Sequence, residues 1–397
     1  MTAPKPVLTG RRRLSEGELA ILLDAHARHA AGQGGKRAML PFVDFSGLDL
    51  AGRDLSGADF TGSVFDAARL SGARLAGANL SGCDLRGADL RNADLRRANL
   101  RGACLTGANL AGADLTEADL RPGKMSMPHP SKGFPTVVEE PRSGYVDGAT
   151  LSGAILDRSQ LNGLNAVGAD LSDSSMKGAQ LTDANFRGAN LAGAALAHAD
   201  VNGADLSNAD FADADLEGVS LTTARTAGAK LGQVRQPPGR PAMVRAEQLV
   251  RQAKAHDAWV RSGGKEGKPT ALDGEDLRPA LAELKGLRLT AVSAKGACLA
   301  GLDLSGAHFQ GANLENADFT GANLAGADLR GARLAGANLT RADLTNAILG
   351  PLPLGPGRET PTNLTGARLR YARLDGADLT RAVTEGVDAR GCRPPLR

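Results

Sequence analysis

Aromatic side chains are scarce in this sequence. Only 3% of the 397 residues are aromatic, with a single tryptophan, whereas 51 residues are glycine. The length alone would allow two or three globular domains, but a large conventional core needs more bulky side chains than this composition provides. The composition therefore indicates a thin core built from small, regularly spaced side chains.

Cysteine is also rare, and none of the four cysteines belongs to a CxxC pair: Cys83, Cys104, Cys298 and Cys392. The sequence therefore predicts neither a disulfide framework nor a zinc site, and we expect no metal and no cofactor. No apolar run reaches the length of a membrane span. Adjacent arginines near the N-terminus suggest an export signal, but Glu16, Glu18 and Asp24 interrupt the apolar region that such a signal needs. We expect a cytoplasmic protein without membrane binding.

A strong excess of charge of one sign is absent as well. The formal net charge is +3, and no dense block of lysine and arginine occurs. This balance does not indicate nucleic acid as a partner, and we expect no direct nucleic-acid binding.

A strict five-residue period is present instead. In "CDLRGADLRNADLRRANLRGACL" a leucine returns at every fifth position, which fits neither a helix nor a strand. If this leucine is position i, alanine occupies i−2, Asp or Asn occupies i−1, and charged or small residues occupy i+1 and i+2. We expect i and i−2 to be buried and the chain to turn at each pentad, forming a solenoid. The predicted core residues of this stretch are Leu85, Leu90, Leu95 and Leu100.

The segment "GADLRNADLRRANL" resembles the pentapeptide-repeat family, whose motif is A(D/N)LXX. The resemblance implies an all-β solenoid, a right-handed quadrilateral β-helix with about 20 residues per coil. It implies less about function, because the family has several roles.

The register of the central residues divides the chain. Leu349 and Leu364 are separated by a multiple of five, which is compatible with a loop that leaves the coil without shifting it. The two other interruptions break the period and are insertions. The expected segments are a tail and helical cap at 1–41, repeats at 42–121, a long surface loop at 122–147, repeats at 148–235, a helical insertion or second cap at 236–284, and repeats at 285–397 with a proline-rich loop at 350–363.

Two non-repetitive segments resemble each other. "LLDAHARHAAGQGGKRAML" and "RQAKAHDAWVRSGGKEGKPTAL" share Ala-His followed by Gly-Gly-Lys. The first is preceded by Ser15 and Glu18, a capping box. We expect duplicated helices that cover solenoid ends, with His26, His256 and Trp259 as packing residues, and two capped units at roughly 14–235 and 244–397.

Chemical alternatives are weak. "MSMPHP" in the loop at 122–147 contains soft ligands that would suit copper(I), but no further ligand lies nearby in the sequence. Ser262 and Pro269 occupy positions where a phosphate-binding loop needs Gly and Ser or Thr. No motif places a nucleophile beside a base, so we expect no enzymatic activity.

Two belts of charge remain as candidate partner-binding surfaces. Arginines at i+1 and aspartates at i−1 each recur every five residues and are expected to encircle one coil: Arg86, Arg91, Arg96 and Arg101; Asp200, Asp205, Asp210 and Asp215. The simpler interpretation is that both belts keep a repetitive β protein soluble. The alternative is docking of a protein by charge complementarity.

The resemblance also implies a specific alternative, because quinolone-resistance members of the family imitate DNA and bind DNA gyrase. Segments 42–121 and 148–235 together carry six net negative charges, about a quarter of those expected on B-DNA of similar length. Segment 285–397 is net positive. We therefore predict a non-enzymatic protein-protein interaction scaffold with an unidentified partner, with modulation of gyrase or topoisomerase as the alternative. The C-terminus, which lacks an apolar capping helix, is compatible with a homodimer through a solenoid end.

Overall fold

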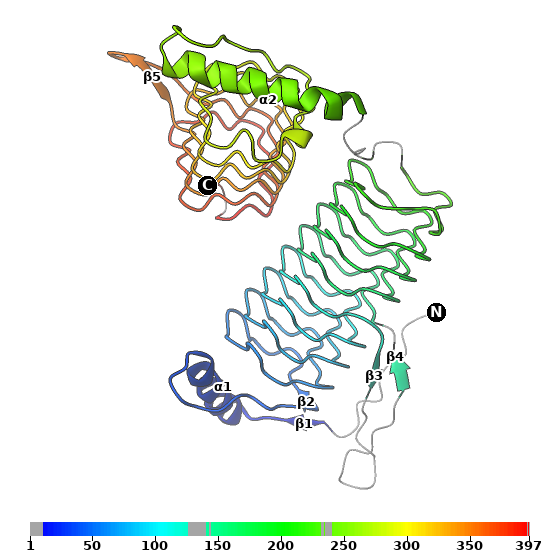
Figure 1. Ribbon diagram of the computed structural model, residues 1–397. Coiled ribbons are helices and arrows are strands. Elements are labelled where there is room, and N and C mark those ends of the chain that lie inside the picture. Colours follow the sequence, from blue (N-terminus) through cyan, green and yellow to red (C-terminus); the bar gives the residue numbers. More distant parts are fainter. Residues whose placement is uncertain are drawn as a thin grey trace. The chain divides into compact units, whose positions relative to one another are not determined.

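The structure is a computed structural model that describes residues 11–125, 140–142, 144–231, 234, 240–394 and 396. The chain forms two compact units, Met1–Pro237 and Pro238–Arg397. Figure 1 shows that each unit is a stack of coils, and each is described by itself below.

Each pentad ends in a tight turn. In a typical one, the Ala88 amide donates to the Leu85 carbonyl at 3.1 Å, and Gly87 between them has φ 62°. Glycine is common at this i+2 position because it adopts a left-handed conformation without steric cost. The aspartate at i−1 stabilises the same turn, since Asp84 Oδ1 accepts the Arg86 amide at 3.3 Å. The pentad sequence thus specifies its own corner.

Successive coils are joined by parallel bridges between residues 20 apart, such as Asp49 with Arg69 and Asp89 with Asn109. Four pentads therefore make one coil, and the backbone amide of each central residue donates to the coil that follows. The bond from Leu90 to the Asn109 carbonyl, for example, is 2.7 Å long. The structure is a β-solenoid, in which each turn buries its apolar side chains against its neighbours.

The interior contains the central residues and the alanines at i−2. Leu85, Leu90, Leu95 and Leu100 are all at most 1% exposed. In the first coils of the first unit, phenylalanine takes the place of leucine at several central positions. The rings of Phe45 and Phe65 stack with centroids 4.8 Å apart. The core is thin and periodic because it contains only two side chains per pentad.

The first unit begins with non-repetitive elements. Strand β1 (Arg12–Arg13) pairs in parallel with β2 (Val43–Asp44), which belongs to the first coil. Helix α1 (Glu16–Ala30) lies between them in the sequence, and its Leu23 packs into the same core as the coils. The predicted capping box is present, because Ser15 Oγ accepts the Glu18 amide and Glu18 Oε2 accepts the Ser15 amide.

The first insertion leaves the solenoid without breaking it. Cys104 bridges to Tyr145, 41 residues further along, so 21 residues exceed the regular spacing. The two ends of the insertion form an antiparallel pair, β3 (Gly123–Met125) with β4 (Glu140–Arg142). The sequence "MSMPHP" falls mainly on 126–130, outside the described residues.

The second unit opens with helix α2 (Arg240–Arg261), which Figure 1 shows lying across one end of its coils. Its Leu249 and Ala253 are buried in the core of that unit. The solenoid bridges begin at Ala271, inside the segment assigned to the helical insertion, and they join residues 22 apart there. The coil that contains the short 3-10 helix η1 (Arg278–Ala280) includes these two extra residues. They shift the five-residue period, so the repeats before and after them are out of phase in the sequence.

The proline-rich segment at 350–363 contains a hairpin of β5 (Leu352–Gly355) and β6 (Arg358–Thr360). Ile348 bridges to Asp378, 30 residues away, so ten residues exceed the regular spacing. Ten residues equal two pentads, which explains why the leucine phase is the same on both sides of the hairpin.

The C-terminal coils of both units are less well covered than their N-terminal coils. Leu216 and Leu231 in the first unit, and Leu379 and Ala389 in the second, are only partly buried although they occupy central positions. In the described part of the second unit no helix follows these coils.

Candidate docking surfaces

The arginine belt of the first unit is largely neutralised within its own pentads. Arg91 donates from Nε and Nη2 to the two carboxylate oxygens of Asp89, at 2.8 and 2.7 Å. Arg96 holds Asp94 in the same bidentate way, and Arg86 holds Asp84. The hydrogen bonds from Arg91 hold the pKa of Asp89 below its ordinary value. These three arginines therefore present neutral pairs to solvent.

Arg101 differs from the rest of the belt because Asn99, not an aspartate, precedes its central residue. Its Nη2 donates instead to the Pro122 carbonyl at 3.3 Å. The belt thus contains one arginine whose charge no carboxylate within the described residues neutralises. Sequence periodicity identified the arginines of the belt but did not show these partners.

The acidic belt is only half neutralised. Lys230 forms an ion pair with Asp210 at 2.8 Å, and Arg225 one with Asp205 at 3.5 Å. The hydrogen bond from Lys230 is the largest cause of the lowered pKa of Asp210. Asp200 and Asp215 form no ion pair with a described residue, and each accepts the backbone amide two residues further on.

The same coil carries further negative charge. Asp210 and Asp215 lie there together with Asp213 and Glu217, and these four residues are called the acidic corner. Asp213 is exposed and has φ 59°, the left-handed turn position. Lys230 is the only cation that forms an ion pair with this corner among the residues described. Sequence reasoning missed Asp213 and Glu217 because it followed only position i−1.

The second unit has a surface of opposite sign that sequence reasoning also missed. Five arginines lie on its last coils and are called the arginine corner: Arg368, Arg370, Arg373, Arg390 and Arg393. Arg370 and Arg390 both bind Asp388, each at 2.6 Å, and these hydrogen bonds lower the pKa of that carboxyl. Arg373 reaches Asp343 at 3.2 Å. The sequence itself contains a sign of this surface, because arginine replaces the usual Asp or Asn at position i−1 at Arg368, Arg373 and Arg393.

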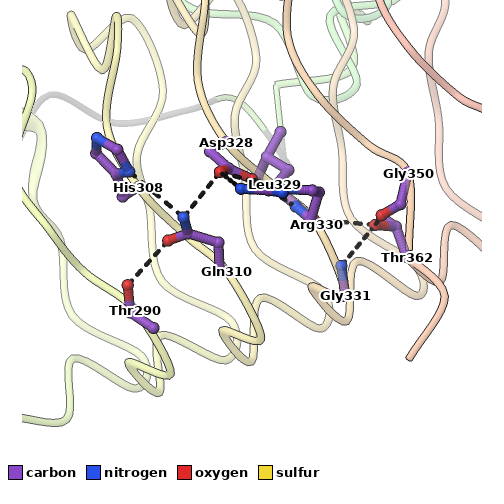
Figure 2. Close-up of polar contacts among 9 residues, drawn as sticks. All are labelled: Thr290, His308, Gln310, Asp328, Leu329, Arg330, Gly331, Gly350 and Thr362. Atoms are coloured by element: carbon purple, nitrogen blue, oxygen red, sulfur yellow. Dashed lines mark hydrogen bonds and ion pairs between the residues drawn. The ribbon is translucent and has the colours of Figure 1, made fainter. Parts of the chain in front are cut away.

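A polar ladder crosses four coils of the second unit (Figure 2). Thr290 donates to Gln310 at 2.9 Å, and Gln310 donates to Asp328 at 2.7 Å. Burial alone would raise the pKa of Asp328, but the hydrogen bonds from Arg330, one of them 2.6 Å long, outweigh this effect and lower it. Because these groups satisfy one another, the ladder is a structural feature and offers no obvious ligand site.

The same ladder ends at the base of the β5–β6 hairpin. The Gly331 amide donates to Thr362 Oγ1, and that hydroxyl lies within hydrogen-bond distance of the Leu329 and Gly350 carbonyls. Thr362 is fully buried, and Figure 2 shows its side chain beside Gly350. The hairpin is therefore fixed at its base to the adjacent coil.

The two histidines assigned to the helical segments are buried. His26 Nδ1 accepts the Ala38 amide at 3.1 Å, and His256 Nδ1 accepts the Thr270 amide at the same distance. The ring of Trp259 lies 5.6 Å from that of His256. Each histidine thus ties a helix to the backbone segment that leads into the coils.

Groups suited to chemistry are not brought together in the described residues. These residues contain no group of three or more His, Cys, Asp or Glu side chains able to hold a metal ion. Burial raises the pKa of the Cys83 thiol to about 12, so this thiol is not a reactive nucleophile. No helix in the described ranges is long and apolar enough to cross a membrane.

Comparison with a sequence model described as pentapeptide repeats gives eight matching copies, which together cover more than half of the chain. The matched residues are 44–82, 83–121, 146–188, 189–225, 288–324, 297–334, 312–350 and 362–393. No curated protein sequence matches the chain.

Several solved structures are similar. QnrB1, a plasmid-mediated fluoroquinolone resistance protein, is 19% identical and matches over 54% of this chain and 97% of its own, with a TM-score of 0.32. HetL from the cyanobacterium Nostoc sp. strain PCC 7120, a pentapeptide repeat protein involved in heterocyst differentiation regulation, is 22% identical over 96% of both chains, with a TM-score of 0.23. Rfr23 from the cyanobacterium Cyanothece 51142, another pentapeptide repeat protein, is 29% identical over 34% of this chain and 88% of its own, with a TM-score of 0.28. At such low TM-scores these similarities carry no argument about function.

Proposed function

Because this chain belongs to the pentapeptide-repeat family, we propose that it is a non-enzymatic interaction scaffold, acting in the cytoplasm, whose acidic belt docks a basic protein surface. The proposal includes the right-handed quadrilateral form of each solenoid, the capping role of α1 and α2, and the segment boundaries derived from the register. One observation carries the functional part: the arginine belt is paired within its own pentads, whereas the acidic belt keeps uncompensated charge.

The two belts differ in the net charge that they present to solvent. Three of the four arginines in the first belt form close bidentate pairs, so little net charge reaches solvent from them. In the acidic belt, Asp200 and Asp215 form no ion pair with a described residue. Uncompensated charge on a rigid surface attracts a complementary patch and accelerates its association. The acidic belt is therefore the better docking surface of the two.

The experiment replaces the four belt aspartates by asparagine: Asp200→Asn, Asp205→Asn, Asp210→Asn and Asp215→Asn. Asparagine removes the charge and retains the oxygen that accepts the turn amide, as Asn190 does for the Ala192 amide at 3.1 Å. We expect the variant to lose proteins that the full-length chain captures from cytoplasmic extract, measured by quantitative mass spectrometry. Its circular dichroism and melting temperature should hardly change.

The matched control carries four similar substitutions in the coils of the arginine belt: Asp89→Asn, Asp94→Asn, Asp114→Asn and Asp119→Asn. It changes the net charge of the protein by the same amount, so it separates the effect of location from that of total charge. Capture by the control should match that of the unmodified chain. Equal capture by the belt variant and the unmodified chain would contradict docking and would leave the acidic belt with a role in solubility alone.

Modulation of DNA gyrase is the second candidate. Asp200 and Asp215, on one coil of the first unit, form no ion pair with a described residue. This unpaired negative charge favours the candidate, because a DNA mimic must present negative charge. The net positive segment 285–397 opposes it over the rest of the chain. A supercoiling assay with purified gyrase tests this candidate directly, and an effect of the full-length chain that the four-asparagine variant lacks would support it.

A further inference from the structure

The backbone at Leu281 adopts a conformation that a leucine strongly disfavours. Leu281 has φ 46° and ψ −111°, close to the first central position of a type II′ turn, where glycine is the usual residue. For a bulky residue such a positive φ is a genuine outlier. The side chain is 72% exposed, so burial in the core does not offset the strain. Strained residues of this kind cluster at ligand-binding and switch sites.

The chain is fixed on both sides of this residue. Ala280 and Leu284 are buried in the core of the second unit. The Glu283 amide donates to the Ala280 carbonyl at 2.9 Å. Lys254 Nζ, on helix α2, donates to Glu283 Oε2 at 2.6 Å and ties the segment to the helix. Leu281 therefore cannot relax into an ordinary turn unless its buried neighbours move.

Leu281 lines a cavity of about 640 Å³ between helix α2 and the segment that follows η1. Ligand sites typically have volumes of about 300–1,000 Å³ and combine apolar walls with a few polar groups. This cavity has both kinds of lining, and we call it the α2 cavity. Its apolar residues are Pro279, Ala280, Leu281, Ala282 and Leu287, and its charged residues are Lys254, Glu283 and Lys285.

The charged lining of the α2 cavity favours an anion. Two lysines and one glutamate give the lining one net positive charge. Lys254 donates to Glu283, and Lys285 donates to Asp303 at 3.2 Å. Because an ammonium has three donors, each lysine retains donors for a further acceptor. The two lysine side chains are 52% and 60% exposed, so both ion pairs are weak and can share their lysines with a ligand.

We propose that the α2 cavity binds a small amphipathic carboxylate. The apolar chain of the ligand lies against Leu281 and Leu287, and its carboxylate accepts hydrogen bonds from Lys254 and Lys285. A single negative charge suits the site better than a phosphate, because Glu283 repels additional negative charge. This inference goes beyond the proposed function, since the acidic belt belongs to the first unit and the α2 cavity to the second.

The first test is isothermal titration calorimetry of the full-length chain with octanoate, octan-1-ol and acetate. Octan-1-ol lacks the negative charge, and acetate lacks the apolar chain. We expect octanoate to bind at least about tenfold more tightly than either of them. Equal binding of acetate would show an adventitious ion only, and equal binding of octan-1-ol would show that the lysines recognise nothing. Either result, or the absence of octanoate binding, would overturn the proposal.

A matched pair of lysine variants tests the head-group contact. Lys285→Met keeps the length of the side chain and removes its charge, so octanoate affinity should fall at least about tenfold while binding of octan-1-ol stays unchanged. Lys295→Met is the control, because Lys295 lies outside the α2 cavity, is 56% exposed and pairs with Glu315 at 3.5 Å. The control should bind octanoate like the unmodified chain. Equal losses in the two variants would refute a specific site.

A second pair tests the strained wall. Leu281→Gly relieves the backbone, because glycine adopts this conformation without steric cost, and it removes the apolar contact. We expect a higher melting temperature together with octanoate affinity several-fold lower. Leu281→Ala retains a Cβ and should lose the affinity without the gain in melting temperature. Octanoate affinity that is unchanged in both variants would remove Leu281 from the site and contradict the proposal.

Discussion

Helices α1 and α2 are two versions of one local design. In both, a buried histidine accepts a backbone amide through Nδ1, at 3.1 Å from Ala38 in the first unit and from Thr270 in the second. In both, the returning chain donates an amide to the carbonyl of the alanine just before that histidine. The bond from Lys36 is 3.1 Å long and that from Lys268 is 3.2 Å.

The two versions differ in how they are attached to the coils. His256 also places Nε2 3.0 Å from the Thr290 carbonyl, and the neighbouring Asp257 accepts the Arg288 amide at 2.7 Å. The buried Nε2 of His26 has no hydrogen-bond partner among the described residues. Helix α1 contributes Leu23 to the core of its unit, and helix α2 contributes Leu249 and Ala253. The two helices thus share apolar packing and differ in the hydrogen bonds that tie them to the coils.

The two segments also differ in which glycine passes close to the helix. Pairing the two Gly-Gly-Lys triplets matches Gly35 with Gly264, but the structure gives the role of Gly35 to Gly267. A Cβ on Gly35 would lie 2.2 Å from the Ala25 carbonyl oxygen, and one on Gly267 would lie 2.0 Å from that of Ala255. The second loop is longer by two residues, which shifts the glycine that passes the helix.

The largest expected effect breaks one unit and tests whether the other survives. Leu90→Asp in the first unit and Leu339→Asp in the second each place an unpaired carboxylate in a core position that is fully buried. Such a group costs several kcal/mol or more, so we expect the altered unit to unfold. Limited proteolysis with mass spectrometry should show cleavage confined to that unit. Leu90→Met, which retains the volume, should remain resistant, whereas resistance of Leu90→Asp would contradict the inward position of the central residue.

A smaller loss of stability is expected from substitution of Gly35 and Gly267, where the chain passes close to a helix carbonyl. Gly35→Ala and Gly267→Ala should each lower the free energy of unfolding by at least about 3 kcal/mol, because the new Cβ collides with a helix carbonyl in addition to the strain of a left-handed residue. Gly34→Ala and Gly263→Ala are matched controls, since both have positive φ but open space around the new Cβ. Thermal unfolding followed by circular dichroism measures the difference, and equal losses in all four variants would reduce the effect to backbone strain.

The two buried histidines should contribute unequally to stability. His256→Ala leaves two backbone groups, on Thr270 and Thr290, without their partner, whereas His26→Ala leaves only the Ala38 amide. We expect losses of about 2 and about 1 kcal/mol respectively, measured by chemical denaturation. Loss of partner capture at unchanged stability would show that these histidines serve binding and not the fold.

The smallest effect concerns pH. Burial lowers the pKa of His26, although Asp54 opposes the shift, while His29 and Arg37 reinforce it. The unfolded chain then binds a proton more readily than the folded unit, so stability is complete above the ordinary pKa of about 6.5 and declines as pH falls toward the lowered value. Denaturation midpoints between pH 7.5 and 5 should show this decline in the unmodified chain and less of it in His26→Asn, which keeps an acceptor that does not titrate. Identical slopes would argue against the contribution of His26.

The sequence by itself determined the pentad register, the inward leucines and alanines, and the capping box of Ser15 and Glu18. These features depend on contacts within a few residues, or on a pattern repeated so often that no insertion obscures it. Only the tertiary structure decided that Lys230 and Arg225 pair with Asp210 and Asp205, that the second solenoid begins at Ala271, and that arginines gather around Asp388. Such contacts depend on which side chains stack 18 or more residues apart and on how inserted loops shift the columns, and a local period does not encode either.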